Sequence, residues 1–173
     1  MIRTTVLATA VLAAPMAFAD SHGGMAEPTG DAAEGEAAFR QCVSCHVVVD
    51  AEGETLAGRR ARTGPNLYGI AGGAAGAVED FRYSGAMEAA GEAGLVWDEA
   101  AFVAYVQDPT GFLRENLGDN SVRGSMSFRV RSEEDALNLF AYLASLAPAP
   151  VPMEDGEDGE ESEEMDDSGE ESE

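Results

Sequence analysis

The stretch Cys42-Val43-Ser44-Cys45-His46 constrains this chain more than any other feature. Two cysteines separated by two residues and followed directly by a histidine form the attachment signature of c-type haem. The spacing places two thiols on one helical turn, where each can add to a haem vinyl group. His46 would then supply the proximal nitrogen, and the opposite face of the iron needs a second ligand or stays open.

The same two thiols allow other interpretations. Cys42 and Cys45 could form a disulfide, a thioredoxin-like redox pair or half of a zinc site. They are the only cysteines in the chain, so no second pair can complete a four-cysteine zinc site. A redox pair does not require His46 or a strand before the cysteines. The preceding residues Phe39-Arg40-Gln41 would in any case form a poor strand. The pattern therefore favours haem attachment.

Both ends of the chain differ from its middle. Residues 1–19 have the form of a secretory signal, with a charged start, an apolar run too short to span a bilayer and Ala17-Phe18-Ala19 before the cleavage point. This predicts export, cleavage after Ala19 and no stable membrane anchor. Residues 20–30 are predicted to be a flexible leader. Residues 148–173, a proline linker followed by almost only Asp, Glu, Gly and Ser, are predicted to be a disordered acidic tail.

Residues 31–147 are predicted to form one helical domain that lacks regular strand alternation, with a surface loop at 47–63 that can hold a short hairpin. The capping and stop signals predict helices from Asp31 to about Gln41, Gly85 to about Ala90, Asp98 to about Gln107 and Ser132 to before Pro148, with a short turn at 109–115. Gly35 lies inside the first helix, where glycine costs about 1 kcal/mol relative to alanine. We therefore expect another helix to cross at Gly35.

The charge balance excludes some classes of partner. The formal net charge is −23, and the ten basic residues are all arginine. Nucleic acids and anionic membrane surfaces are therefore not expected partners. The predicted loops are long for so small an apolar core, and a large buried cofactor would supply the missing apolar volume.

The order of motifs resembles that of class I cytochromes c, and is most similar to the exported bacterial relatives of mitochondrial cytochrome c. The matching motifs are the Gly35/Phe39 helix, Cys42-x-x-Cys45-His46, Gly64-Pro65-Asn66-Leu67, Phe81-x-Tyr83, Trp97, Tyr105 with Pro109, Met126-x-Phe128 and the final helix with Tyr142-Leu143. The resemblance covers residues 31–146. It implies an all-α fold of four to five helices and long loops wrapped around one haem c, held by two thioethers with His and Met as axial ligands.

The resemblance also assigns roles to single residues. Cys42 and Cys45 would form the thioethers and His46 the proximal ligand. The carbonyl of Pro65 would accept the other ring proton of His46, which fixes the tautomer. The sixth ligand would be Met126.

Three aromatic residues complete the implied site. Tyr83 and Trp97 would hydrogen-bond a haem propionate, and Tyr105 would lie beside the methionine sulfur. The family usually has an arginine after the position of Gly69, whereas this chain has Gly72-Gly73 there. Replacements for that arginine could come from Arg59, Arg60, Arg62 or Arg82.

Met126 can also be assessed without the family. Of seven methionines, two lie in the predicted signal, one in the leader and two in the tail. Met87 falls in a predicted helix among alanines and is more simply part of the core. Met126 lies in a loop before the last helix, where its thioether is the best-placed soft ligand.

Together these features predict a monomeric periplasmic electron carrier and not an enzyme. Expected partners are a donor of the quinol:cytochrome c reductase type and an acceptor of the oxidase or reaction-centre type. The alternatives are a haem-c catalyst or gas sensor with an open sixth site, and a cytochrome subunit of a dehydrogenase or oxidase. Arginines rather than lysines flank the expected ligand loop and predict a small basic docking face; they are Arg40, Arg114, Arg123, Arg129 and Arg131.

Overall fold

The computed structural model describes residues 26–147 and contains five helices and one short hairpin. The elements, in chain order, are α1 (Ala32–Phe39), β1 (Val47–Val49), β2 (Thr55–Gly58), α2 (Gly85–Glu92), α3 (Glu99–Gln107), α4 (Pro109–Leu117) and α5 (Glu133–Ser145). The predicted all-α class with four to five helices is confirmed. The predicted signal peptide and acidic tail lie outside the described residues.

The helices begin where short polar side chains cap them. Asp31 accepts hydrogen bonds from the backbone N–H groups of Ala33 and Glu34, at 2.8 and 3.0 Å. Asp98 and Ser132 cap α3 and α5 in the same way, as their sequence positions predicted. Helix α1 ends at Phe39, two residues earlier than expected, and residues 109–115 belong to a full helix instead of a short turn.

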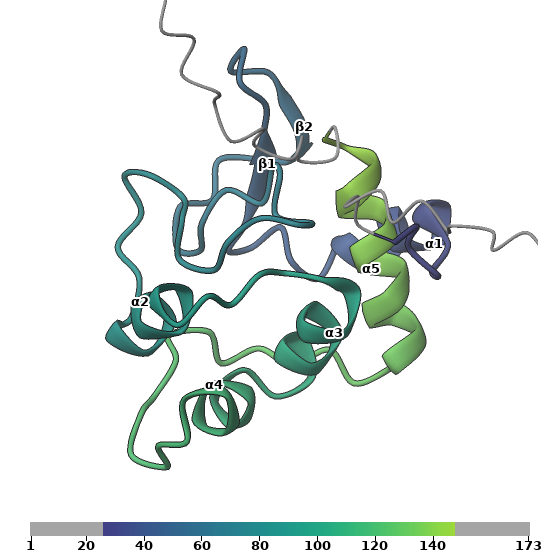
Figure 1. The fold of residues 1–173 in the computed structure, drawn as a ribbon. Helices are drawn as coiled ribbons and strands as arrows, with labels where there is room; N and C mark the ends of the chain where they lie inside the picture. Colours follow the sequence, from purple (N-terminus) through teal and green to yellow (C-terminus); the bar gives the residue numbers. More distant parts are fainter. Residues whose placement is uncertain (1–25, 148–173) are drawn as a thin grey trace, which may run out of the picture.

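Helices α1 and α5 cross at closest approach around Gly35, as expected from its place in α1 (Figure 1). A Cβ atom at Gly35 would overlap the backbone carbonyl of Asn138 on α5. Beside it, the rings of Phe39 and Tyr142 pack with centroids 5.6 Å apart. The backbone N–H of Asp31 donates to the Asn138 side chain at 2.7 Å. The first and last helices are thus joined by direct backbone contact.

Gly35→Ala is therefore expected to destabilise the protein although alanine is the better helix former. The added methyl group meets backbone atoms that cannot rotate away, so the expected loss is about 3 kcal/mol or more in the free energy of unfolding. Gly85→Ala is the control, because a Cβ there meets nothing within 4 Å. Guanidinium unfolding followed by helical circular dichroism measures both. Equal stabilities for the two variants would contradict the close crossing.

The hairpin supports the loop that follows it. Val47 pairs with Gly58 and Val48 with Ala57 in an antiparallel register, with an irregularity before Val49. The Asn66 side chain then bonds to both backbone groups of Val49, accepting from its N–H at 2.9 Å and donating to its carbonyl at 2.7 Å. These bonds fix residues 64–69 against β1.

The end of the expected leader is held against two helices. The backbone N–H and the hydroxyl of Thr29 donate to the Glu99 carboxylate at 2.7 and 2.9 Å. Gly30 lies so close to α5 that a Cβ would overlap the backbone of Leu137. The packed domain therefore begins before residue 31.

The core takes buried side chains from all five helices. Its most buried large side chains are Leu113, Leu139, Phe140 and Leu143, each at most 2% exposed. Phe140 packs on Phe102 of α3 with ring centroids 5.4 Å apart. Among residues 26–147, no helix has the length and apolar character needed to cross a membrane.

Candidate functional site

One cavity of about 310 Å³ gathers every residue that was predicted to attach, ligate or directly contact the haem. Its wall is mainly apolar and includes side chains from α1, α2, α3 and α5. The predicted site residues that line it are Cys42, Cys45, His46, Pro65, Tyr83, Trp97, Tyr105 and Met126. Residues up to 84 positions apart in the chain thus share one cavity.

His46 is oriented by a backbone acceptor. Its Nδ1 lies 3.0 Å from the carbonyl oxygen of Pro65. Because a carbonyl can only accept, Nδ1 carries the proton and Nε2 keeps its lone pair. Burial lowers the pKa of His46, and the bond to Pro65 only partly opposes that effect. The neutral imidazole therefore presents a free Nε2, which is the form that binds a metal.

Gly64 makes room for that ring. A Cβ at Gly64 would overlap the His46 imidazole, and the backbone N–H of Gly64 donates to the Cys45 carbonyl at 2.8 Å. Neither Gly64 nor Asn66 was singled out as a site residue from the sequence. Their signal was the turn sequence Gly64-Pro65-Asn66-Leu67, but their contacts depend on how this loop folds over His46.

The two cysteines are half-buried free thiols in the turn after α1. Burial raises the pKa of Cys42 to about 11, and the neighbouring Cys45 adds to the rise. Catalytic dithiols have the opposite property, a lowered thiol pKa. The described residues also contain no cluster of three or more His, Cys, Asp or Glu that could bind a metal ion. The redox-pair and zinc interpretations therefore find no support in the geometry.

An aromatic group forms another part of the wall. The rings of Trp97 and Tyr105 lie 4.9 Å apart between centroids, and Phe112 packs on both. Burial raises the pKa of Tyr105 to about 12, with a further contribution from Tyr83. Burial also raises the pKa of Tyr83. Both phenols thus stay protonated at neutral pH and can donate hydrogen bonds.

Two methionines line the cavity. Met87 lies on α2 and is 6% exposed, so it belongs to the core as expected and also borders the cavity. Met126 lies in the irregular segment between α4 and α5 and is partly exposed. Its thioether reaches the same space as the His46 imidazole.

Charged side chains are absent from the lining of this cavity. The candidates for replacing the family's arginine, which were Arg59, Arg60, Arg62 and Arg82, do not border it. The polar groups that do border it are neutral hydroxyl, amide, imidazole and indole groups. A carboxylate entering the cavity would meet neutral donors only.

These residues fit a covalently attached haem. The apolar wall suits a macrocycle, and two thiols lie in the lining to form thioethers. One imidazole nitrogen and one thioether sulfur are available as ligands of an iron ion. Tyr83, Trp97 and Tyr105 in the lining carry neutral hydrogen-bond donors.

Comparison with known proteins gives the same result. No family model matches the chain. A cytochrome c2 of Rhodovulum adriaticum is 63% identical over 118 residues, covering 68% of this chain and 94% of the relative. A cytochrome c-551 of Roseobacter denitrificans is 46% identical over 149 residues, covering 85% and 97%. The solved structure of cytochrome c2 from Rhodobacter sphaeroides superposes with a TM-score of 0.67 at 52% identity, covering 68% of this chain and 96% of that one.

The chain therefore belongs to the class I c-type cytochromes and binds haem c covalently. Within that family, the relatives similar to this chain are named cytochrome c2, cytochrome c-550 and cytochrome c-551.

Proposed function

We propose that this protein is a soluble periplasmic electron carrier, and not an enzyme, that shuttles single electrons between respiratory or photosynthetic redox complexes. The observation that carries the proposal is that His46 and Met126 line one cavity. With both groups on the iron, no coordination position remains for a substrate. When bound, the haem supplies a one-electron Fe(II)/Fe(III) couple. A buried thioether ligand favours the reduced state and raises the reduction potential.

The residues have the following proposed roles. Cys42 and Cys45 anchor the cofactor, and Nε2 of His46 and the sulfur of Met126 are the axial ligands. Pro65 holds the His46 tautomer through its carbonyl, which makes the imidazole a better donor. Because a protein ligand would hold the iron on each face, little rearrangement accompanies a change in iron charge.

The three aromatic residues have proposed roles at the edge of the haem and beside its sulfur ligand. Tyr83 and Trp97 donate to a propionate, and Tyr105 lies beside the ligand sulfur. Trp97 is 4% exposed, and its indole packs against the rings of Tyr105 and Phe112. Neutral donors can hold a carboxylate without a compensating arginine.

The carrier is tested with the purified wild-type protein. We expect a single reversible one-electron wave in a potentiometric titration and no carbon monoxide binding by the reduced form at neutral pH. Mass spectrometry of the exported protein should show a mature chain that begins at Asp20 and carries one haem. Ready binding of carbon monoxide would favour the catalyst or gas sensor with an open sixth site.

Partner docking is proposed at an arginine-bearing hollow beside the cavity. This open hollow of about 650 Å³ includes Phe128, which is 44% exposed, Arg129 and Arg131. Arg131 lines the hollow, whereas Arg123 does not; both are exposed and make no polar contact within residues 26–147. On an otherwise acidic body they favour a partner with an acidic, partly apolar surface, of the reductase, oxidase or reaction-centre type.

Removing both exposed charges should slow electron transfer to such a partner. Arg123→Gln with Arg131→Gln is expected to lower the second-order rate on the order of ten-fold at low ionic strength, with the difference fading as salt rises. Stopped-flow mixing with the partner complex measures this rate. Ala37→Glu with Ala104→Glu changes the net charge equally at exposed positions outside the hollow and the cavity. If both double variants react at the same rate, docking at this hollow is excluded.

A further inference from the structure

The segment between α4 and α5 carries Met126 but has little backbone support. Within the described chain, no backbone–backbone hydrogen bond involves residues 120–129. The next such bond runs from the Val130 N–H to the Val106 carbonyl at 2.9 Å. The position of Met126 must therefore be fixed by side chains.

One side-chain contact lies just after Met126. An oxygen of Asp108 accepts from Nη2 of Arg129 at 2.6 Å. The same oxygen accepts from the Gly111 N–H at 3.2 Å, since Asp108 is the N-cap of α4. The hydrogen bond to Gly111 thus holds at the start of α4 the same carboxylate that binds Arg129. The two side chains are 58% and 50% exposed, so the pair is accessible to salt.

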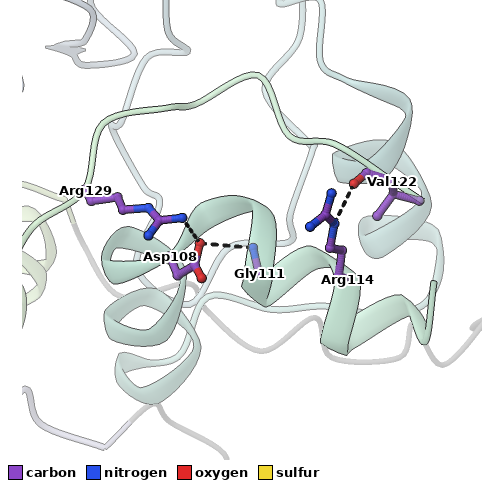
Figure 2. A network of polar contacts seen from close by, with 5 residues as sticks. All are labelled: Asp108, Gly111, Arg114, Val122 and Arg129. Carbon is purple, nitrogen blue, oxygen red and sulfur yellow. Dashed lines mark hydrogen bonds and ion pairs between the residues drawn. The ribbon is translucent and has the colours of Figure 1, made fainter. Parts of the chain in front are cut away.

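A second contact lies just before Met126. Arg114, near the end of α4, donates from Nε to the Val122 carbonyl at 3.1 Å in a partly buried position. Next to it, Gly124 passes so close to Leu113 that an added Cβ would come within 3.0 Å of a leucine methyl group. Figure 2 shows the segment arching from Val122 to Arg129, with each end tied to α4.

We propose that these two contacts act as a clamp, which consists of Asp108–Arg129 and Arg114–Val122, and that it positions Met126 in the cavity. Met126 lies four residues after Val122 and three before Arg129, so both ends of its arch are anchored to one helix. The clamp lowers the fraction of molecules in which the thioether has left the iron. The inference rests on the proposed role of Met126 as a ligand, and Asp108, Arg114 and Arg129 are positioning residues.

The affinity for an added ligand measures that fraction. Imidazole binds the ferric protein only when the Met126 thioether has left the iron. Its apparent affinity therefore rises in proportion to the fraction of molecules in that state. A half-exposed ion pair or a single charge-assisted hydrogen bond changes such an equilibrium by up to about five-fold. Because the two contacts lie at separate ends of the arch, their effects should multiply.

The experiment is a spectrophotometric imidazole titration of the ferric full chain. Arg129→Gln and Arg114→Met should each raise the affinity by about two- to five-fold, and the double variant on the order of ten-fold. Arg131→Gln and Arg123→Gln also remove one charge but break no polar contact of the described residues, and should leave the affinity within about two-fold of wild type. Rising salt should increase the wild-type affinity but not that of Arg129→Gln.

Asp108→Asn provides a second test, because it keeps a capping oxygen while removing the charge, and should match Arg129→Gln. A merely structural role would shift the global unfolding midpoint without changing imidazole affinity under native conditions. The oxidised wild-type protein should show the weak near-infrared band of sulfur-to-iron coordination. If it does, and Arg129→Gln and Arg114→Met behave like Arg131→Gln, the clamp is overturned and the ligand assignment stands. If the wild-type protein lacks that band, both the clamp and the assignment of Met126 as a ligand are excluded.

Discussion

A chain in which Cys42 and Cys45 are both replaced by alanine is expected to have little helix and little resistance to proteases. Without the haem, the mainly apolar wall of the cavity of about 310 Å³ would face water. Each large apolar side chain left exposed costs roughly 1.5–3 kcal/mol, and the entire stability of a small domain is only about 5–15 kcal/mol. In addition, residues 59–84 contain no helix or strand and wrap around this space.

Far-ultraviolet circular dichroism and limited proteolysis measure this effect, with the variant expressed with residues 1–19 intact. Ser44→Ala is the matched control, because Ser44 is exposed and lies in the same turn between the cysteines. That variant should keep the haem and the wild-type spectrum. Recovery of a stable, helical, haem-free protein from the cysteine variant would show that the polypeptide packs well without its cofactor.

Met126→Ala is expected to abolish the weak near-infrared band of sulfur-to-iron coordination in the oxidised protein. The reduced variant should bind carbon monoxide, because alanine leaves one face of the iron open. Met87→Leu is the control, since Met87 is the other methionine that lines the cavity and leucine nearly conserves its volume. The control should keep the band and exclude carbon monoxide.

The opposite pattern would reassign the ligand. If Met87→Leu lost the band and Met126→Ala kept it, the sulfur would come from α2. That outcome would also remove the basis of the α4 clamp. Optical spectra of the two variants, recorded under the same conditions, decide between the two methionines.

Helix starts were the most predictable part of the fold. Asp31, Asp98 and Ser132 cap their helices as expected, because capping joins groups only two or three residues apart. The sequence predicted only a short helical turn at 109–115, where the structure has helix α4 (Pro109–Leu117). Its apolar pattern is sparse, although Asp108 before Pro109 and the left-handed Gly118 after it mark both ends.

The site was predictable to the extent that its chemistry is written in a contiguous motif. Cys42, Cys45 and His46 followed from spacing alone, whereas the roles of Tyr83, Trp97 and Tyr105 came only through a family resemblance. Apart from the helix crossing at Gly35, contacts between distant segments had no signal in the sequence. The Asp108–Arg129 pair depends on the path of an irregular segment between residues 21 positions apart.

The place of α5 also sets an order of events during maturation. Leu139 and Leu143 of this helix form one wall of the cavity that holds both thiols, and α5 closes onto α1 around Gly35. Because a chain is synthesised from its N-terminus, the haem-binding turn emerges about ninety residues before the helix that covers it. We expect thioether formation to precede the docking of the last helix, so that a finished cofactor bond serves as the checkpoint for closing the fold.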